Sequence, residues 1–208
     1  MEAEIRGLSK RFNGQAVFEN LNLALSSRQP VCLMSPSGAG KTTLLRILMG
    51  LETADQGSIQ WTEGGRRLSS SSIRFSAVFQ EDRLCEAFNP VENILMAAGR
   101  TLTREEAQAE LSILLPPSCL SRPVRTFSGG MKRRTAICRA LLAPSQVILM
   151  DEPFTGLDEE NRRLAIRYIL QKAGGRLLVV TTHLREDVGL LGGKLVGLGG
   201  QDASENNG

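Results

Sequence analysis

The stretch VCLMSPSGAGKTTLL, residues 31–45, decides the fold of this chain. Its first four residues form an apolar run short enough for a buried strand, and good helix formers follow from residue 44 to residue 48. A tight segment with two glycines lies between them. A strand, a glycine-containing loop and a helix start are the context that phosphate binding needs. The sequence therefore predicts that backbone N–H groups of this loop and the helix N-terminus bind phosphate.

The loop of residues 35–40, here called the P-loop, departs from the usual pattern at one position. The pattern G-x-x-x-x-G-K-[ST] asks for glycine where this chain has Ser35, whereas Gly38 and Gly40 remain and tolerate positive φ. Lys41 is expected to reach the β- and γ-phosphates, and the Thr42 hydroxyl to ligate Mg²⁺. We expect Ser35 to alter nucleotide affinity without abolishing it. The alternative is a surface turn that contains Gly-Lys-Thr by chance.

Composition sets the broad class of the protein. A chain of 208 residues with 41% hydrophobic content fits one sizeable domain with a substantial core. The net charge is only +3, which gives no overall reason to expect a polyanionic partner. Its four cysteines show no C-x-x-C spacing, so we expect no zinc or disulfide framework and a reducing, cytosolic compartment. No run approaches the roughly 18 apolar residues of a membrane span, and the N-terminus lacks the pattern of a signal peptide.

Strand and helix patterns continue along the rest of the chain. Apolar or alternating runs predict strands over residues 2–8, 20–25, 57–61 and 73–80, with a polar loop at 64–72. Capping boxes at Asn89 and Thr103 then predict helices. These helices form an insertion of about forty residues, which we place at about 84–127.

Two later runs, 147–150 and 177–182, predict buried strands that end in polar residues. Asp151 and Glu152 follow the first strand, and His183 follows the second. The carboxyl ends of parallel strands form the edge at which open α/β sheets bind ligands. Adjacent residues that leave a strand point in different directions, so one carboxylate can face Mg²⁺ and the other the γ-phosphate. The alternative is a solvent-facing strand end. Two carboxylates that directly follow a buried apolar run lose hydration, however, and this cost must be offset by a cation.

Two further helix starts carry capping residues. Ser128 is a natural N-cap, and Gly129 and Gly130 follow it, so this start is a second potential anion site. The alternative is an ordinary capped helix. Asp158 is the expected N-cap of the next helix. Phe12 lies in the turn between the first two strands, where it is either exposed or a core residue at a strand end.

Taken together, these motifs resemble the ATP-binding subunit of an ABC transporter over nearly the whole chain. The matches are Walker A (Gly38, Gly40, Lys41, Thr42, Thr43), the Q-loop (Gln80), the signature (127–131), Walker B (147–152), the D-loop (157–158) and the switch histidine (His183). Phe12 falls where the family places an aromatic residue that stacks on adenine. Six motifs in family order and spacing are hard to obtain by chance. The departures are Ser35 in Walker A and Met131 in place of the signature glutamine.

The resemblance implies a fold as well as a function. We expect an α/β, P-loop NTPase (RecA-like) core with a mostly parallel sheet, an N-terminal antiparallel β region and the helical subdomain inserted at about 84–127. The ABC-type ATP-binding domain would span residues 1–198. The polar, glycine-rich stretch 199–208 is expected to be a disordered tail.

The resemblance also implies the chemistry, with ATP and Mg²⁺ as ligands. Two copies would pair head to tail, each ATP lying between Walker A of one and the signature of the other. Thr42 and Gln80 would ligate Mg²⁺ with Asp151 assisting, Glu152 would act as general base on water, and His183 would contact the γ-phosphate. The implied catalytic residues are Glu152, His183, Lys41 and Gln80, and the implied nucleotide contacts are Phe12, Ser35, Pro36, Ser37, Gly38, Ala39, Gly40, Lys41, Thr42, Thr43, Ser128, Gly129, Gly130 and Asp158.

Partners follow from the same resemblance. Separate transmembrane permease subunits and a second ATP-binding subunit are implied, which places this chain in the cytoplasm, peripheral on the inner face of the cell membrane. The short insertion and the sequence of residues 88–94 are similar to those of importers of the nitrate, sulfonate and taurine type. This similarity implies import with a solute-binding protein. A groove near Gln80 and Phe88 would receive the coupling helix of the permease.

Two rival functions stay open at this point. A non-transport ABC ATPase acting on nucleic acid or ribosomes usually carries tandem cassettes or coiled-coil insertions, and this chain has one cassette and no heptads. No direct contact with nucleic acid is expected, and we interpret the basic cluster as a solvated helix face: Arg122, Arg125, Lys132, Arg133 and Arg134. The second rival is a regulatory nucleotide-binding subunit that barely hydrolyses ATP.

Overall fold

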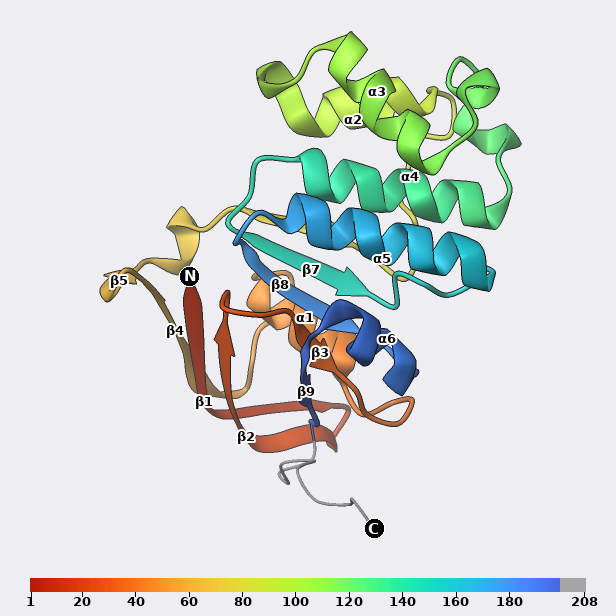
Figure 1. Ribbon diagram of the computed structural model, residues 1–208. Helices are drawn as coiled ribbons and strands as arrows, with labels where there is room; N and C mark the ends of the chain where they lie inside the picture. The colour runs from red at the N-terminus through yellow and green to blue at the C-terminus, as the bar shows by residue number, and fades with distance from the viewer. Residues whose placement is uncertain (199–208) are drawn as a thin grey trace.

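Two β-sheets and several helices make up the described part of the chain (Figure 1). The computed structural model describes residues 1–198, so the tail expected at 199–208 lies outside the described residues. One sheet is antiparallel and contains, in spatial order, β2 (Gln15–Ser26), β1 (Glu2–Phe12), β4 (Gln56–Glu63) and β5 (Arg66–Leu68). The other is parallel and contains β6 (Phe75–Val78), β7 (Val147–Asp151), β8 (Leu177–Thr181), β3 (Val31–Leu33) and β9 (Lys194–Val196).

The helices cover the parallel sheet on both faces. In Figure 1, α4 and α5 lie side by side over one face, with α2 and α3 stacked beyond α4, while α1 and the antiparallel sheet lie on the other face. Their bounds are α1 (Lys41–Leu48), α2 (Pro90–Ala98), α3 (Arg104–Leu114), α4 (Gly129–Leu142), α5 (Glu159–Ala173) and α6 (Arg185–Leu191). No helix within residues 1–198 is both long and apolar enough to span a lipid bilayer.

The central strand β7 shows why its sequence is a continuous apolar run. Ile148 and Met150 pack in one hydrophobic cluster with the helices α2 to α5. Val147 and Leu149 pack in a second cluster with α1 and the antiparallel sheet. Successive side chains of a strand point to opposite faces, so a strand covered on both faces needs apolar residues throughout. The sheet is thereby held rigidly between two cores.

Both predicted capping boxes are present. The Asn89 side chain accepts a hydrogen bond from the Glu92 amide, and the Glu92 carboxylate accepts one from the Asn89 amide, each at 2.9 Å. Thr103 and Glu106 make the same reciprocal pair at the start of α3. Between residues 84 and 127 the described elements are α2, α3 and short 3₁₀ turns (Gly99–Thr101, Pro117–Cys119, Val124–Thr126). Local signals in the sequence therefore located these helices.

Short elements were predicted incorrectly or missed. The stretch 64–72, expected to be a polar loop, contains β5, because Gly64 and Gly65 with positive φ return the chain beside β4. It also contains a 3₁₀ turn at Ser70–Ser72. No element was predicted after residue 183, where the structure has α6 and β9. These pieces have seven and three residues, too few to show a clear periodicity.

A core substitution tests this two-sided packing. Leu149→Ala removes a side chain that is 0% exposed in β7, so we expect it to lower the free energy of unfolding by about 2–5 kcal/mol. Leu170→Ala makes the same chemical change on α5, where the side chain is 42% exposed, and should lower it by less than about 1 kcal/mol. Urea unfolding followed by circular dichroism measures both, and equal losses would contradict the described packing.

Candidate functional site

The parallel sheet delivers the predicted polar residues to one edge. Thr181 at the end of β8 lies opposite both Leu33 of β3 and Asp151 of β7. The Thr182 amide donates a hydrogen bond to the Leu33 carbonyl at 3.2 Å. The loops that follow β3, β7 and β8 therefore leave the sheet at the same level, as expected for ligand sites in open α/β sheets.

The P-loop and the start of α1 are tightly fitted against the antiparallel sheet. Gly40 is the N-cap of α1 with φ of 89°, and a Cβ at this position would lie 2.5 Å from Cγ1 of Val17. Only glycine fits there without a rearrangement. Lys41 is 6% exposed, and its ammonium donates to the carbonyl oxygens of Ser35 (2.7 Å) and Pro36 (3.3 Å). The P-loop thus holds the Lys41 ammonium beside the N-terminus of α1.

A cavity of about 300 Å³ lies in front of this loop. Its lining residues come from β2, the P-loop, α1 and two other loops: Val17, Ser37, Gly38, Gly40, Lys41, Thr42, Thr43, Gln80 and Glu152. Gln80 and Glu152 are remote from the P-loop in sequence, and the fold brings them to the same cavity as Lys41. Its volume is at the lower end of the range of small-molecule sites.

Oxygen donors suited to a hard cation gather beside this cavity. The Thr42 hydroxyl donates to Oδ2 of Asp151 at 2.6 Å, and a neighbouring cavity of about 190 Å³ is lined by Thr42, Gln80 and Asp151 among others. Hydroxyl, amide and carboxylate oxygens are ligands that Mg²⁺ accepts. Within residues 1–198 no group of three or more His, Cys, Asp or Glu side chains could hold a metal ion. Mg²⁺ here would therefore need phosphate and water oxygens as well, which is its usual mode of binding.

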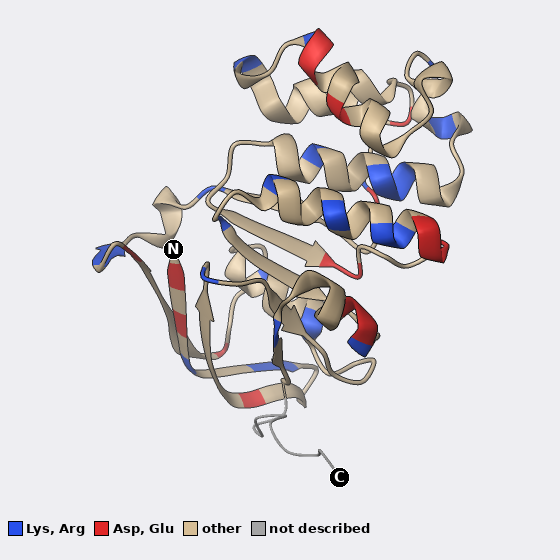
Figure 2. Ribbon diagram, viewed as in Figure 1, with Lys and Arg blue, Asp and Glu red and all other residues tan. Residues whose placement is uncertain are grey.

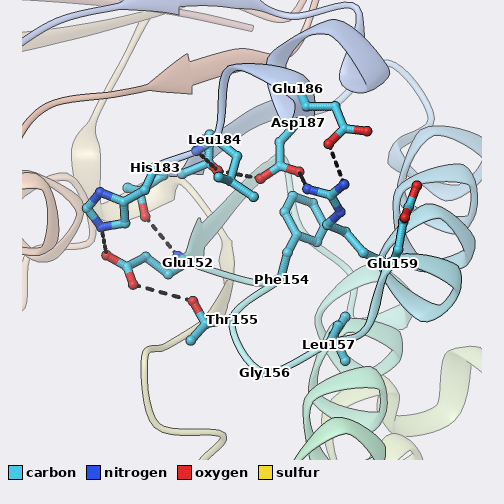
Figure 3. Close-up of a pocket in the computed structure, with 13 residues that line it drawn as sticks. Glu152, Phe154, Thr155, Gly156, Leu157, Glu159, His183, Leu184, Glu186 and Asp187 are labelled. Carbon is cyan, nitrogen blue, oxygen red and sulfur yellow. Dashed lines mark hydrogen bonds and ion pairs between the residues drawn. The ribbon is translucent and has the colours of Figure 1, made fainter.

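Glu152 and His183 form a second polar pair at the same edge (Figure 3). Nε2 of His183 lies 2.6 Å from Oε1 of Glu152, and the Glu152 amide donates to the Thr181 hydroxyl at 2.8 Å. Glu152 has φ of 49°, a left-handed conformation that costs a non-glycine residue about 1–3 kcal/mol. This turn separates its carboxylate from that of Asp151. The prediction that the two adjacent carboxylates diverge is confirmed.

Lys41, Asp151 and His183 line three adjoining cavities rather than one. Thr42 and Gln80 belong to both the P-loop cavity and the cavity beside Asp151. The third cavity, about 410 Å³, is lined by His183 and shares Glu152 with the P-loop cavity. Shared residues thus connect the three cavities along one rim of the sheet.

The glycine-rich start of α4 lies outside these three cavities. Ser128 caps the helix by accepting a hydrogen bond from the Met131 amide at 3.3 Å, as predicted. A Cβ at Gly130 would lie 3.4 Å from Cδ2 of Leu157, so this helix start faces the loop before α5. Ser128 and Gly129 are exposed. Within this chain, the second predicted anion site and the P-loop therefore border different spaces.

Asp158 and Phe12 have simpler surroundings. Asp158 caps α5 by accepting a hydrogen bond from the Asn161 amide at 2.8 Å, and these N-cap hydrogen bonds lower the pKa of its carboxyl. The Phe12 side chain is 44% exposed, with the Lys10 ammonium 4.8 Å from the ring centroid. The alternative interpretation of Phe12 as a core residue is therefore wrong.

The expectation of a solvated basic cluster holds for Arg122 and Arg125, which lie before α4 and are exposed, but is wrong for Arg133 on α4. Figure 2 shows Lys and Arg gathered along α4 and α5. Arg133 is only 7% exposed, and its guanidinium donates to the carbonyl oxygens of Phe79 (2.7 Å) and Gln80 (2.6 Å). It also pairs with Asp82 at 3.2 Å. Arg133 therefore fixes the backbone of the loop that carries Gln80, a role that charge spacing in the sequence could not reveal.

Ser35 fits the P-loop by a contact that glycine could not make. Its φ is not in the positive range, so the position does not require glycine. The Ser35 hydroxyl donates to the Met34 carbonyl at 2.8 Å and accepts a hydrogen bond from the Leu198 amide at 2.9 Å. The substitution thus joins the beginning of the P-loop to the segment that follows β9.

Comparison with known proteins agrees with this geometry. A family model described as "ABC transporter" matches residues 18–155. The chain is 34% identical to an aliphatic sulfonates import ATP-binding protein of Pseudomonas fluorescens, over 97% of this chain and 75% of that protein. It is also 34% identical to a Nod factor export ATP-binding protein of Ralstonia nicotianae, over 88% of this chain, but spans only 60% of that protein's length. A sulfate/thiosulfate import ATP-binding protein of Pseudomonas putida is 33% identical over 90% of this chain, with 60% of its length spanned.

Solved structures share the fold. A dimeric ATP-binding cassette in a post-hydrolysis state with ADP and phosphate superposes with a TM-score of 0.79 and 23% identity, covering 95% of this chain and 94% of that one. An ABC transporter ATP-binding protein from Pyrococcus furiosus gives 0.81 and 19%, covering 95% and 98%. The predicted P-loop NTPase fold, with its parallel sheet, antiparallel β region and helices, is confirmed.

The Ser35 contact can be tested by stability. Ser35→Ala leaves the buried Leu198 amide without its acceptor, so we expect the free energy of unfolding to fall by about 1 kcal/mol. Ser37→Ala makes the same change at an exposed position of the same loop and should alter it by less than about 0.5 kcal/mol. Chemical denaturation measures the difference, and indistinguishable variants would show that the hydroxyl contact does not stabilise the fold.

Proposed function

This chain belongs to the ABC transporter family, and on that premise we propose that it is the ATP-binding and ATP-hydrolysing subunit of an importer. The family's ATP-binding subunits are ATPases whose activity is coupled to transport. The observation that carries the proposal is the meeting of Lys41, Gln80 and Glu152 on one cavity in front of the P-loop. The ammonium of Lys41 and the start of α1 suit the binding of a triphosphate. The amide of Gln80 and the carboxylate of Glu152, facing the same cavity, suit its hydrolysis.

The P-loop and Lys41 would bind the phosphates of ATP. The Lys41 ammonium rests on two loop carbonyl oxygens, and a phosphate entering the cavity would offer it anionic acceptors instead. The amides at the start of α1 add partial positive charge to the same space. Phe12, exposed at the end of β1, offers a ring on which adenine would stack. The other P-loop residues would contact the phosphates through their backbone.

Thr42, Gln80 and Asp151 are the residues that would hold Mg²⁺. When bound, Mg²⁺ neutralises negative charge that builds up on the phosphate oxygens. Asp151 is 5% exposed and is oriented by the hydroxyls of Thr42 and Thr181, so its carboxylate is held at the edge of the sheet before any cation arrives.

Glu152 and His183 would act on the terminal phosphate. Glu152 lines the P-loop cavity and would accept a proton from the attacking water. His183, 2.6 Å from it, would both orient this carboxylate and contact the γ-phosphate. Phosphoryl transfer has a loose transition state, so catalysis would come from positioning and charge stabilisation.

A second copy or a related subunit would complete the site. Ser128, Gly129 and Gly130 lie at an exposed helix start outside the P-loop cavity, which supports their binding to ATP held by a partner subunit. Asp158 lies at the start of α5, and its chain neighbour Leu157 lies beside Gly130. We also propose that residues 1–198 form the ABC-type ATP-binding domain with a helical subdomain inserted at about 84–127. The chain would work in the cytoplasm, peripheral on the inner membrane face.

Separate permease subunits would receive the energy of hydrolysis. Phe88 is 44% exposed and follows Gln80 by eight residues in the chain, and a coupling helix of the permease would dock between them. The similarity to a sulfonate import protein supports import, with a solute-binding protein as a further partner. The rival function on nucleic acid receives no support from α4, because Lys132, Arg133 and Arg134 contact groups within this chain. The other rival, a regulatory subunit that barely hydrolyses ATP, is distinguished by measuring the ATP turnover of the wild-type protein.

Glu152→Gln tests hydrolysis directly. The amide cannot accept the proton of the attacking water, so we expect ATP turnover to fall by about 100-fold or more. ATP-dependent dimerisation, measured by light scattering, should remain. Glu159→Gln removes an exposed carboxylate at the start of α5 and should leave turnover within about twofold. Wild-type protein without turnover but with ATP-dependent dimerisation would favour the regulatory subunit.

Two equally exposed phenylalanines separate ATP binding from coupling. Phe12→Ala removes a stacking surface worth about 1–3 kcal/mol, so the Kd for ATP should rise by about tenfold. Phe88→Ala, also at a side chain that is 44% exposed, should leave the Kd of the isolated chain unchanged. In the complex with its permease, Phe88→Ala should abolish the stimulation of ATPase activity by transport substrate. Unchanged transport in that variant would exclude the docking groove.

A further inference from the structure

A buried ion pair lies beside the cavity that His183 lines. Asp187, at the third position of α6, is 1% exposed, and Arg162 of α5 is 9% exposed. Nη1 of Arg162 donates to Oδ1 of Asp187 at 3.2 Å, and Nη2 donates to the exposed Glu186 at 2.5 Å. Burying a carboxylate removes its hydration, and a buried ion pair is often no more stable than apolar residues of similar size. Stability alone therefore does not account for a buried carboxylate at this position.

The other oxygen of Asp187 holds the residue before His183. The Thr182 hydroxyl donates to Oδ2 of Asp187 at 2.5 Å, and the same hydroxyl accepts a hydrogen bond from the Leu184 amide at 3.1 Å. The Thr182 hydroxyl therefore links the two chain neighbours of His183 to each other. The Thr182 amide is fixed in addition by the Leu33 carbonyl.

The imidazole itself has little support from packing. The His183 side chain is 41% exposed, and its bond to Glu152 at 2.6 Å is the contact that orients the ring. Its position consequently depends on the backbone of residues 182–184. That backbone is tied through Thr182 to Asp187, and through Asp187 to Arg162. Arg162 and Asp187 line the third cavity and not the cavity in front of the P-loop.

We propose that Arg162, Asp187 and Thr182 are positioning residues that hold His183 against Glu152. The proposal rests on the proposed function for its consequence in ATP hydrolysis, whereas the orientation of His183 can be read without ATP. Asp187→Asn is nearly isosteric, but its amide offers an acceptor to only one of the two donors, Arg162 or Thr182. If the amide oxygen accepts from Thr182, the bond to Arg162 is lost; if it accepts from Arg162, the Thr182 hydroxyl faces an N–H donor and can no longer donate to this residue.

The test uses the fact that His183 is the only histidine in the chain. Its ring C–H resonance in an NMR spectrum of the full chain is therefore unambiguous. In Asp187→Asn and Thr182→Val we expect this resonance to shift or broaden, because the imidazole loses its fixed position. Thr182→Ser keeps the hydroxyl and should restore the wild-type resonance. Glu186 is the exposed partner of Arg162 and makes no contact with Thr182. Glu186→Gln should therefore leave the resonance unchanged.

ATPase kinetics supply the second measurement. Asp187→Asn and Thr182→Val should lower kcat on the order of tenfold with KM for ATP within about twofold, since a misplaced group affects the transition state rather than binding. A wild-type resonance and wild-type kcat in both variants would overturn the proposal, as would an equal effect of Glu186→Gln. If Asp187→Asn does not fold, the pair Thr182→Val and Thr182→Ser decides. Wild-type protein without ATPase activity would overturn the proposed function alone, because the resonance still reports the position of His183.

Discussion

The carboxylate of Asp151 is the group on which the arrangement of this site depends. It is 5% exposed, and its two oxygens accept hydrogen bonds from Thr42 at the start of α1 and from Thr181 at the end of β8. A buried carboxylate must have such partners, because its hydration is lost. Thr42 is reached from β3 through the P-loop, whereas Thr181 is the last residue of β8. The two bonds join the end of β7 to the end of β8 and to the helix that follows β3, so the geometry of the site depends on how these strands pair in the sheet.

Thr181 extends this connection to the second carboxylate. Its hydroxyl donates to Asp151 at 2.8 Å and accepts a hydrogen bond from the Glu152 amide at 2.8 Å. The left-handed conformation of Glu152 then sends its side chain toward His183, away from Asp151. Two adjacent carboxylates thus reach separate spaces, one beside Thr42 and the other in front of the P-loop.

Local signals allowed much of the fold and site to be predicted. The caps at Asn89, Thr103, Ser128 and Asp158 use atoms within three residues, and the strand before Asp151 is a continuous apolar run, so both are visible in sequence. What could not be predicted depends on long-range contacts. The burial of Arg133 is decided by carbonyl oxygens more than fifty residues away. Likewise β9 has three residues and exists because β3 offers it a partner.

The helix α4 connects two parts of the site that do not share a cavity. It begins at Gly129, in the exposed glycine-rich segment. One turn later, the Arg133 guanidinium donates hydrogen bonds to the backbone carbonyls of Phe79 and Gln80. A helix is stiff over this distance, because its backbone hydrogen bonds fix the rise per residue. On the proposed function, a displacement of the helix start by ATP on a partner subunit would therefore move the carbonyls that precede and include Gln80. On that function, the buried arginine would make the residues matched to the signature and the Q-loop move together, with no need for a conformational change within the helix.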